Sequence, residues 1–383
     1  MPNSRQQNTM AGRHAIVLIL LACLSGSASG GDDRMGFTTY YFTDSGENNV
    51  ITTSFNLAKK LLEQTMLLID IELDNVTVPP VTAITGATRP QRRKTEPFEK
   101  TRGQVILGLE QQFGQETSIA ANAYRSQEVD YVSNAVVGTF SQEMFGRQTT
   151  LTLRGQFNAD LVGEILDNGD VLNRRKRQYT GTSTISQILS PTTILDAGYD
   201  YMIVKGFQGD PYRQVAVRDA TGNLTQTDEL HPSARTRQAA TAKISQMIPS
   251  IEASIIGSYR YYFDNWNVRS HTGEVRLNKY LIRDLIFGID YRYYTQTGAY
   301  FYREQYSGPQ YLGAALRTAD YKLTPFSSNN FGVSLTFLLR GLARGNKDLE
   351  FLQSSSVEVM YFRYFNDLYF TADIFQTSLK FSL

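Results

Sequence analysis

Serine and histidine are the residue types that could give this chain hydrolytic chemistry, and histidine is scarce. Three histidines occur among 383 residues. His231 precedes Pro232 in a polar stretch and is expected to be a solvated loop residue. His271 directly follows Ser270, and adjacent residues of a strand point to opposite faces, so the two side chains would not share a proton. We therefore expect a protein that is not an enzyme, with a membrane hydrolase that uses His271 as the weaker alternative.

Oxygen-rich and basic clusters offer other chemistry. Residues 167–170 (DNGD) carry carboxylates that suit calcium, but the full calcium-binding loop is missing, so an ordinary turn is favoured. Residues 174–177 (RRKR) and 92–94 (RRK) are expected in outward loops, where they would contact lipopolysaccharide phosphates or water. The chain has no phosphate-binding glycine loop, so we expect neither a metal nor a cofactor. A net charge of +1 gives no support for nucleic-acid binding.

Alternation of apolar and polar residues runs through most of the chain. In residues 64–74 (QTMLLIDIELD), leucine and isoleucine alternate with Asp70 and Glu72. Segments 284–294 and 331–340 show the same period of two, which is typical of strands with two different faces. Such segments predict about 16 strands, an even number that places both termini on one side. We assign 319–326 to an extension of the strand near residue 335, because an additional strand would make the number odd.

The connections between these strands alternate in length. Short ones are expected at 114–116, 145–147, 190–192 and 249–250, and long ones at about 75–102, 161–177, 206–232 and 297–328. Transmembrane barrels have short periplasmic turns and long external loops. The sequence therefore predicts an all-β fold, a transmembrane antiparallel β-barrel with that arrangement of turns and loops.

Closure of the sheet decides where the charged residues must lie. A barrel has no unpaired edge in lipid, where each unpaired backbone group costs several kcal/mol. A lysine or arginine that faces the middle of the bilayer costs about 2–4 kcal/mol, so the strand charges are expected to face a water-filled lumen. The expected lumen-lining residues are Asp70, Glu72, Glu110, Arg154, Asp196, Asp200, Arg260, Glu274, Arg276, Asp290, Arg292, Glu358 and Lys380. Their mixed signs predict no strong selectivity, and ion pairs along the wall are favoured over a dedicated binding track.

Aromatic residues are abundant, with 23 Tyr and 21 Phe beside a single Trp. The clusters 40–42 (YYF), 259–263 (YRYYF) and 291–294 (YRYY) are expected to form the girdles that such barrels place at the membrane interfaces. Trp266 follows a turn signal at Asp264 and is expected to anchor an interface rather than to recognise a ligand.

The N-terminus carries a sorting signal. Two arginines precede the apolar run 15–24 (AIVLILLACL) and a series of small residues. This pattern predicts a secretory signal peptide over residues 1–30, which leaves 31–383 as the barrel. Loss of the two arginines would change the net charge from +1 to −1. Cys23 is the only cysteine and would be discarded with this segment, unless it is lipidated instead.

The C-terminus carries a second signal. Leu379, Phe381 and Leu383 alternate with polar residues, as in the last strand that the barrel-assembly machinery recognises by strand pairing. A terminal leucine stands where an aromatic residue is usual. We expect this machinery, outer-membrane lipid and lipopolysaccharide to be partners of the chain, and the bacterial outer membrane to be its location.

Several segments resemble an uncharacterised family of bacterial outer-membrane β-barrels, the domain of unknown function numbered three-five-seven-zero. The matching segments are 40–50 (YYFTDSGENNV), 83–90 (AITGATRP), 206–215 (GFQGDPYRQV), 233–237 (SARTR), 259–272 (YRYYFDNWNVRSHT) and 319–326 (ADYKLTPF). The resemblance extends over nearly the whole chain. It implies a β-barrel without an established activity, and it implies a small lipoprotein as a partner in an envelope redox or maturation system.

Two functions follow from these observations. The favoured one is a passive pore or channel for small solutes in the outer membrane. The alternative is a barrel that serves as a receptor or scaffold for a periplasmic or surface partner such as a lipoprotein. The paths of the two longest loops, 206–232 and 297–328, would decide whether the lumen is open.

Overall fold

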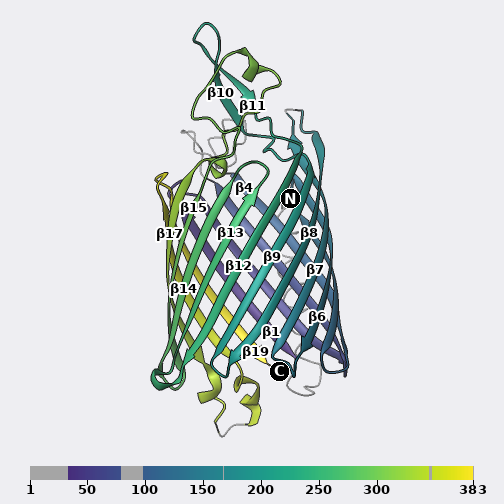
Figure 1. The fold of residues 1–383 in the computed structure, drawn as a ribbon, viewed down its shortest axis with the longest axis vertical. Helices are drawn as coiled ribbons and strands as arrows, with labels where there is room; N and C mark the ends of the chain where they lie inside the picture. The colour runs from purple at the N-terminus through teal and green to yellow at the C-terminus, as the bar shows by residue number, and fades with distance from the viewer. Residues whose placement is uncertain (1–32, 79–97, 167, 345–346, 383) are drawn as a thin grey trace, which may run out of the picture.

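The computed structural model describes residues 33–78, 98–166, 168–344 and 347–382, and these form a closed barrel of 16 antiparallel strands (Figure 1). Each of the 16 predicted strands is present, so the predicted fold class is confirmed. The barrel strands are β1 (Arg34–Asp44), β2 (Asn49–Leu62), β3 (Thr65–Val78), β4 (Phe98–Phe113), β5 (Thr117–Gln127), β6 (Tyr131–Met144), β7 (Thr149–Ile165), β8 (Val171–Ser190), β9 (Thr193–Gly206), β12 (Ala234–Ile248), β13 (Ala253–Asp264), β14 (Arg269–Ile282), β15 (Leu285–Gln296), β17 (Phe326–Leu338), β18 (Ser356–Asn366) and β19 (Thr371–Ser382).

The first and last strands close the barrel. Phe37 of β1 lies opposite Phe55 of β2 on one side and opposite Leu379 of β19 on the other. The ladder between β1 and β19 runs from Arg34↔Ser382 to Asp44↔Ala372, which is nearly the whole length of both strands. Because every barrel strand has two neighbours, the described barrel has no free edge.

The period-two pattern separates the two faces of the wall. Ile289 of β15 is 45% exposed, and its register partners Leu277 and Val333 are 39% and 45% exposed. Asp290 is the next residue of β15 and points to the opposite face, where it pairs with Arg276. Around β15, the apolar side chains therefore face outward and the ionised side chains face inward.

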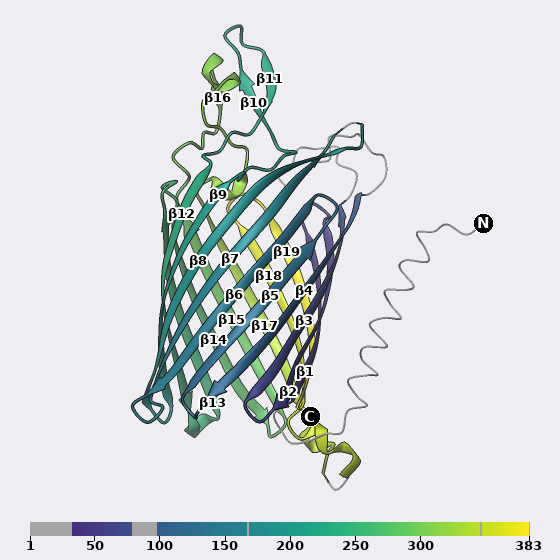
Figure 2. The same ribbon diagram turned by 90° about the vertical axis from the view of Figure 1, so that its right-hand side faces the viewer.

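The two ends of the barrel differ. At the turn end, which holds the start of β1 and the end of β19, most connections are tight (Figures 1 and 2). The exception is the connection between β17 and β18, which contains η4 (Leu339–Gly341) and η5 (Lys347–Leu352). At the loop end, two long connections, 207–233 and 297–325, lead beyond the rim, whereas β13 and β14 are joined there by 265–268 alone.

The two long connections build a small sheet that the sequence did not predict. It contains β10 (Gln214–Arg218), β11 (Leu224–Asp228) and β16 (Tyr306–Ser307), and it stands beyond the barrel rim (Figure 2). β16 pairs in parallel with β10 and so links the two connections. Val215, Val217 and Tyr306 form its buried core. The remaining 3₁₀ helices are η1 (Pro249–Ile251), η2 (Pro309–Leu312) and η3 (Tyr321–Leu323).

The structure corrects sequence predictions about strand ends. Segment 319–326 is not an extension of the following strand, because Asp320 accepts a hydrogen bond from the Lys322 amide and starts η3, and β17 begins only at Phe326. The loop predicted at 161–177 is mostly strand, since β7 ends at Ile165 and β8 begins at Val171. Among the described residues, no helix is long and apolar enough to cross a membrane.

Candidate binding site at the loop end of the barrel

A cavity of about 510 Å³ lies at the loop end, between the inner wall and the two long connections. Strands β12 to β15 form its wall, and residues of 207–233 and 297–325 cover it. We call it the mouth cavity. Its lining residues are Gln208, His231, Arg235, Arg237, Thr241, Ser258, Arg260, Tyr262, Trp266, Val268, Ser270, Thr272, Glu274, Arg292, Tyr294, Gln296, Asp320, Lys322 and Leu323.

The cover of the mouth cavity is held by contacts between the two connections. Leu230 and Arg317 exchange backbone hydrogen bonds of 3.0 Å in both directions. The Arg317 side chain is buried and donates to the carbonyls of Asp228 at 2.7 Å and Gly313 at 2.7 Å. Glu229 accepts hydrogen bonds from the Thr318 hydroxyl and the Ala319 amide, each at 2.8 Å. These contacts fix both connections in one arrangement over the mouth.

Asp264, at the end of β13, organises the wall of the cavity. Its Oδ1 accepts hydrogen bonds from the amides of Trp266 at 2.9 Å and Val268 at 3.0 Å, which is the aspartate turn that the sequence predicted. Its Oδ2 accepts from Arg235 Nε at 2.8 Å and from the Tyr262 hydroxyl at 2.6 Å. One buried carboxylate therefore holds a turn, a cation and a phenol together.

Trp266 is not an interface anchor, contrary to the sequence prediction. It is only 2% exposed and belongs to a buried cluster with Val268, Phe301 and Leu323. The connection 297–325 supplies the apolar residues that cover it, which local sequence does not reveal. The guanidinium of Arg235 lies 4.2 Å from the indole ring on another side.

His231 is likewise not a solvated loop residue. Its side chain is 4% exposed and its ring lies 5.5 Å from the rings of both Trp266 and Phe301.

Two tyrosines assigned to the aromatic girdles, Tyr262 and Tyr294, face the mouth cavity, because they have the opposite parity to the exposed Tyr259 and Tyr293. The sequence prediction placed all the aromatic residues of these two strands at the membrane interfaces, whereas those of one parity face the lumen.

Most charged residues around the cavity form ion pairs between strands. Arg292 Nε lies 3.1 Å from Glu274 Oε1, between β15 and β14. Arg260 lies 3.6 Å from Asp200 and reaches over β12. Arg237 forms no ion pair with a described residue, and its buried Nε has no hydrogen-bond partner there. Arg235 and Arg237 were not among the predicted lumen-lining residues, because the segment 233–237 was used only for the family resemblance, whereas it lies at the start of β12.

The register places the predicted lumen-lining residues on the inner face of the wall, along the whole barrel. Below the cavity, Asp196 pairs with Lys243 at 3.1 Å, Lys380 with Glu358 at 3.4 Å, and Arg276 with Asp290. Glu72 pairs with Arg102 at 2.6 Å, and Arg154 donates to Gln156 at 3.0 Å. Asp70 and Glu110 have no ion pair among the described residues. Arg102 was not among the predicted lumen-lining residues, because the loop predicted at 75–102 included it, whereas β4 begins at Phe98.

Comparison with known proteins decides the family. A family model described as "Protein of unknown function (DUF3570)" matches residues 28–359. This chain belongs to the DUF3570 family. A search of curated proteins finds no match to it. The resemblance noted in the sequence is thereby confirmed.

Solved barrels are similar to this DUF3570 protein in architecture. One is the "CymD monoaromatic hydrocarbon channel", with 8% identity, a TM-score of 0.44, and coverage of 93% of this chain and 89% of that chain. OpdK of Pseudomonas aeruginosa with vanillate has 8% identity and a TM-score of 0.43, with coverage of 92% and 100%. A loop-deletion mutant of OmpT from Vibrio cholerae has 9% identity and a TM-score of 0.47, with coverage of 92% and 99%.

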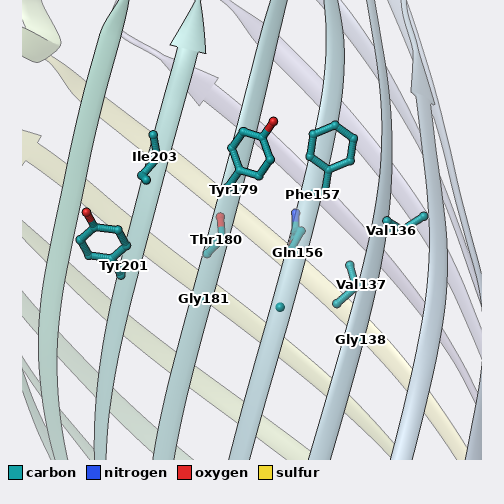
Figure 3. A pocket seen from close by; sticks show the side chains of 11 residues that line it. Val136, Val137, Gly138, Gln156, Phe157, Tyr179, Thr180, Gly181, Tyr201 and Ile203 are labelled. Atoms are coloured by element: carbon teal, nitrogen blue, oxygen red, sulfur yellow. The ribbon is translucent and has the colours of Figure 1, made fainter.

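A second hollow, of about 560 Å³, is bordered by residues of β6 to β9 (Figure 3). Gly138, Gly155 and Gly181 stand in register on β6, β7 and β8 and leave the wall thin. The rings of Phe157 and Tyr179 border it, with their centres 5.1 Å apart. The hollow is mainly apolar, so the mouth cavity is the better candidate for recognition of a polar solute.

Other predicted sites fall in different places. The cluster 174–177 lies within β8 and not in a loop, where Arg174 pairs with Glu164 at 2.7 Å and Lys176 with Asp160 at 3.4 Å. Residues 168–170 form a turn in which Asn168 Nδ2 donates to Asp170 Oδ2 at 2.7 Å. The described residues contain no group of three or more metal-ligating side chains.

Several predictions concern residues outside the described ranges. These are the signal peptide at 1–30, Cys23, the basic cluster 92–94, Asp167 and Leu383. Leu379 and Phe381 lie on β19, where they pair with Phe37 and Met35 of β1. Ser270 faces the mouth cavity, and His271 lies on the outer wall beside Tyr259.

Proposed function

We propose that this DUF3570 protein is a pore of the bacterial outer membrane through which small solutes diffuse. The observation that carries the proposal is the exposure of charged side chains inside the closed wall. Arg292 and Glu274 face the lumen with 51% and 49% of their side chains exposed. Charged groups with that much uncovered surface require water, because their burial without full compensation is costly. The described lumen therefore suits a water-filled path.

The outer wall supports a location in the membrane. Its exposed residues include Leu107 at 52%, Val136 at 59% and Phe331 at 49%. A soluble protein rarely exposes such a continuous apolar surface. Outer-membrane lipid and lipopolysaccharide are the proposed surroundings, and the barrel-assembly machinery is the proposed route of insertion. Catalysis is not part of the proposal, because Ser270 and His271 lie on opposite faces.

Ionic current through planar bilayers tests the proposal. We expect the purified protein to give discrete current steps. Thr241 faces the mouth cavity and Ala240 faces outward on the same strand, which provides a matched pair. In a Cys23→Ser background, a bulky water-soluble thiol reagent is expected to reduce the current of Thr241→Cys and to leave Ala240→Cys unchanged. Absence of current, or equal block of both variants, would refute the pore.

A receptor or scaffold role is the second candidate. The sheet of β10, β11 and β16 favours it, because this sheet stands beyond the rim where a surface partner could reach it (Figure 2). A partner such as a lipoprotein, recovered in a fixed ratio with a barrel that conducts no current, would support this role over the pore.

A further inference from the structure

Arg237 faces the mouth cavity without a partner among the described residues. Its guanidinium forms no ion pair there, and its Nε atom is buried without a hydrogen-bond acceptor. A buried donor of this kind costs free energy unless an acceptor reaches it, and an ionised donor costs more than a neutral one. The arrangement is thus incomplete without an anion or ordered water at Arg237.

The carboxylates near Arg237 already have other cations as partners. Asp264 accepts a hydrogen bond from Nε of Arg235 at 2.8 Å, and the carboxylate of Glu274 lies 3.1 Å from Nε of Arg292. Asp320, on the cover, lies 3.3 Å from Arg213 and also caps η3. Among the described residues, each of these nearby carboxylates is therefore already paired with a cation other than Arg237.

Two cations of the cavity have no ion pair with a described residue. Its lining contains five cations, of which Arg235, Arg260 and Arg292 pair with Asp264, Asp200 and Glu274, which leaves Arg237 and Lys322. Lys322 reaches it from the cover and forms no ion pair with a described residue, and its ammonium lies 5.8 Å from the Tyr321 ring. Cations on both the wall and the cover favour an anion between them.

The remaining surface of the cavity suits an organic group. Tyr262 and Tyr294 face it from β13 and β15, and their hydroxyls donate to Asp264 at 2.6 Å and to Gln296 at 2.5 Å. With the hydroxyls engaged, the rings are left to contact an apolar part of a ligand. The volume of about 510 Å³ lies in the range of pockets that hold small organic molecules.

We propose that the mouth cavity binds a small organic carboxylate and that Arg237 is the residue that pairs with the carboxylate. A guanidinium can donate two parallel hydrogen bonds to a carboxylate, which gives both affinity and orientation. The inference rests on the proposed function, because it names the solute class for which a pore would provide this site. The mixed charges of the lumen predict no strong selectivity, and the proposal adds one local site that prefers an anion.

Fluorescence of Trp266 provides a direct test, because it is the only tryptophan of the chain and it lines the cavity. The full protein in detergent micelles is titrated with sodium benzoate at constant ionic strength, with excitation at the red edge of the indole band. Benzamide, the neutral analogue of similar shape, is the matched control. We expect a saturable change with benzoate and at least about tenfold weaker binding of benzamide, as a charge-assisted hydrogen bond implies. Equal responses to the two compounds would overturn the proposal.

Two variants test the assigned residue. Arg237→Gln is expected to fold, because it removes a buried Nε donor that has no acceptor among the described residues, and to bind benzoate about tenfold or more weakly. Arg276→Gln removes an arginine that pairs with Asp290 outside the cavity and is expected to bind benzoate like the parent protein. If Arg237→Gln fails to fold, Arg237→Lys is the replacement test. It keeps the positive charge but cannot donate two parallel hydrogen bonds, so it is expected to bind benzoate more weakly than the parent protein does. Unchanged binding by the folded Arg237 variant would contradict the assignment.

The source of the negative charge and the pore itself are tested separately. Inorganic phosphate under the same conditions is expected to bind more weakly than benzoate, and equal binding would overturn the carboxylate class. Saturable benzoate binding by a barrel that conducts no current would refute the pore and keep the site. Current without benzoate binding would refute the site and keep the pore.

Discussion

Arg235 donates from Nε to the carboxylate of Asp264 over 2.8 Å, and both residues are buried at the loop end of the barrel. The same carboxylate caps the turn between β13 and β14. Arg235 in turn covers the indole of Trp266 at 4.2 Å. The pair thus connects the barrel wall to the buried cluster under the cover, and it leaves the neighbouring Arg237 without this acid.

Replacement of Asp264 is expected to loosen the mouth of the barrel. Asp264→Ala leaves the Arg235 charge buried without its partner, which costs about 3–5 kcal/mol of unfolding free energy. Asp264→Asn keeps an oxygen that accepts from the turn amides, so its free energy of unfolding is expected to fall by less than that of Asp264→Ala. Urea unfolding in detergent, followed by Trp266 fluorescence, measures both. A loss below about 1 kcal/mol for Asp264→Ala would show that the pair does not stabilise the mouth.

The cover depends on the hydroxyl of Tyr306. It donates to the Phe301 carbonyl at 2.9 Å and accepts from the Thr318 amide at 3.0 Å. Tyr306→Phe leaves these buried groups unpaired, at a cost of about 1–3 kcal/mol. We expect hydrogen exchange at Thr318 to accelerate about tenfold or more. Tyr311→Phe is the control, since its hydroxyl has no hydrogen bond with a described residue; acceleration of equal size there would contradict the account.

Two glycines are expected to respond oppositely to alanine. Gly206 has φ of +103°, and a Cβ there would lie 2.2 Å from the Arg175 carbonyl oxygen. Gly206→Ala is therefore expected to cost about 1–3 kcal/mol. A Cβ on Gly155 would meet nothing within 4 Å, so Gly155→Ala is expected to be neutral or to stabilise by up to about 1 kcal/mol. Urea midpoints in the same lipid vesicles compare them, and equal midpoints would rule out backbone strain at Gly206.

The barrel itself could be predicted because its constraint is local. Closure in lipid imposes a period of two on each strand, and the pattern in 64–74 or 284–294 is visible without any tertiary information. Strand ends beyond the apolar part of the wall were harder to place. Arg174 and Lys176 look like a loop in sequence, and they lie in β8 because Glu164 and Asp160 of β7 pair with them.

The mouth cavity could not be predicted, because its parts are distant in sequence. Arg317 binds the backbone of Asp228, and the cluster around Trp266 needs Phe301 from another connection. Alternation says nothing about such contacts between loops. The segment 233–237 is identified in the sequence only as a motif. Because β12 begins at Ala234, Arg235 and Arg237 lie on the strand that forms the wall of the mouth cavity.

The inside–outside assignment is tested most directly by a cysteine scan of β15 in lipid vesicles, in a Cys23→Ser background. Even-numbered positions such as 290 and 292 face the lumen, and odd-numbered positions such as 289 and 291 face outward. We predict that a charged, water-soluble thiol reagent modifies cysteines at the even positions and not those at the odd positions. Modification that favours the odd positions, or that shows no alternation, would contradict the closed barrel with a water-filled interior.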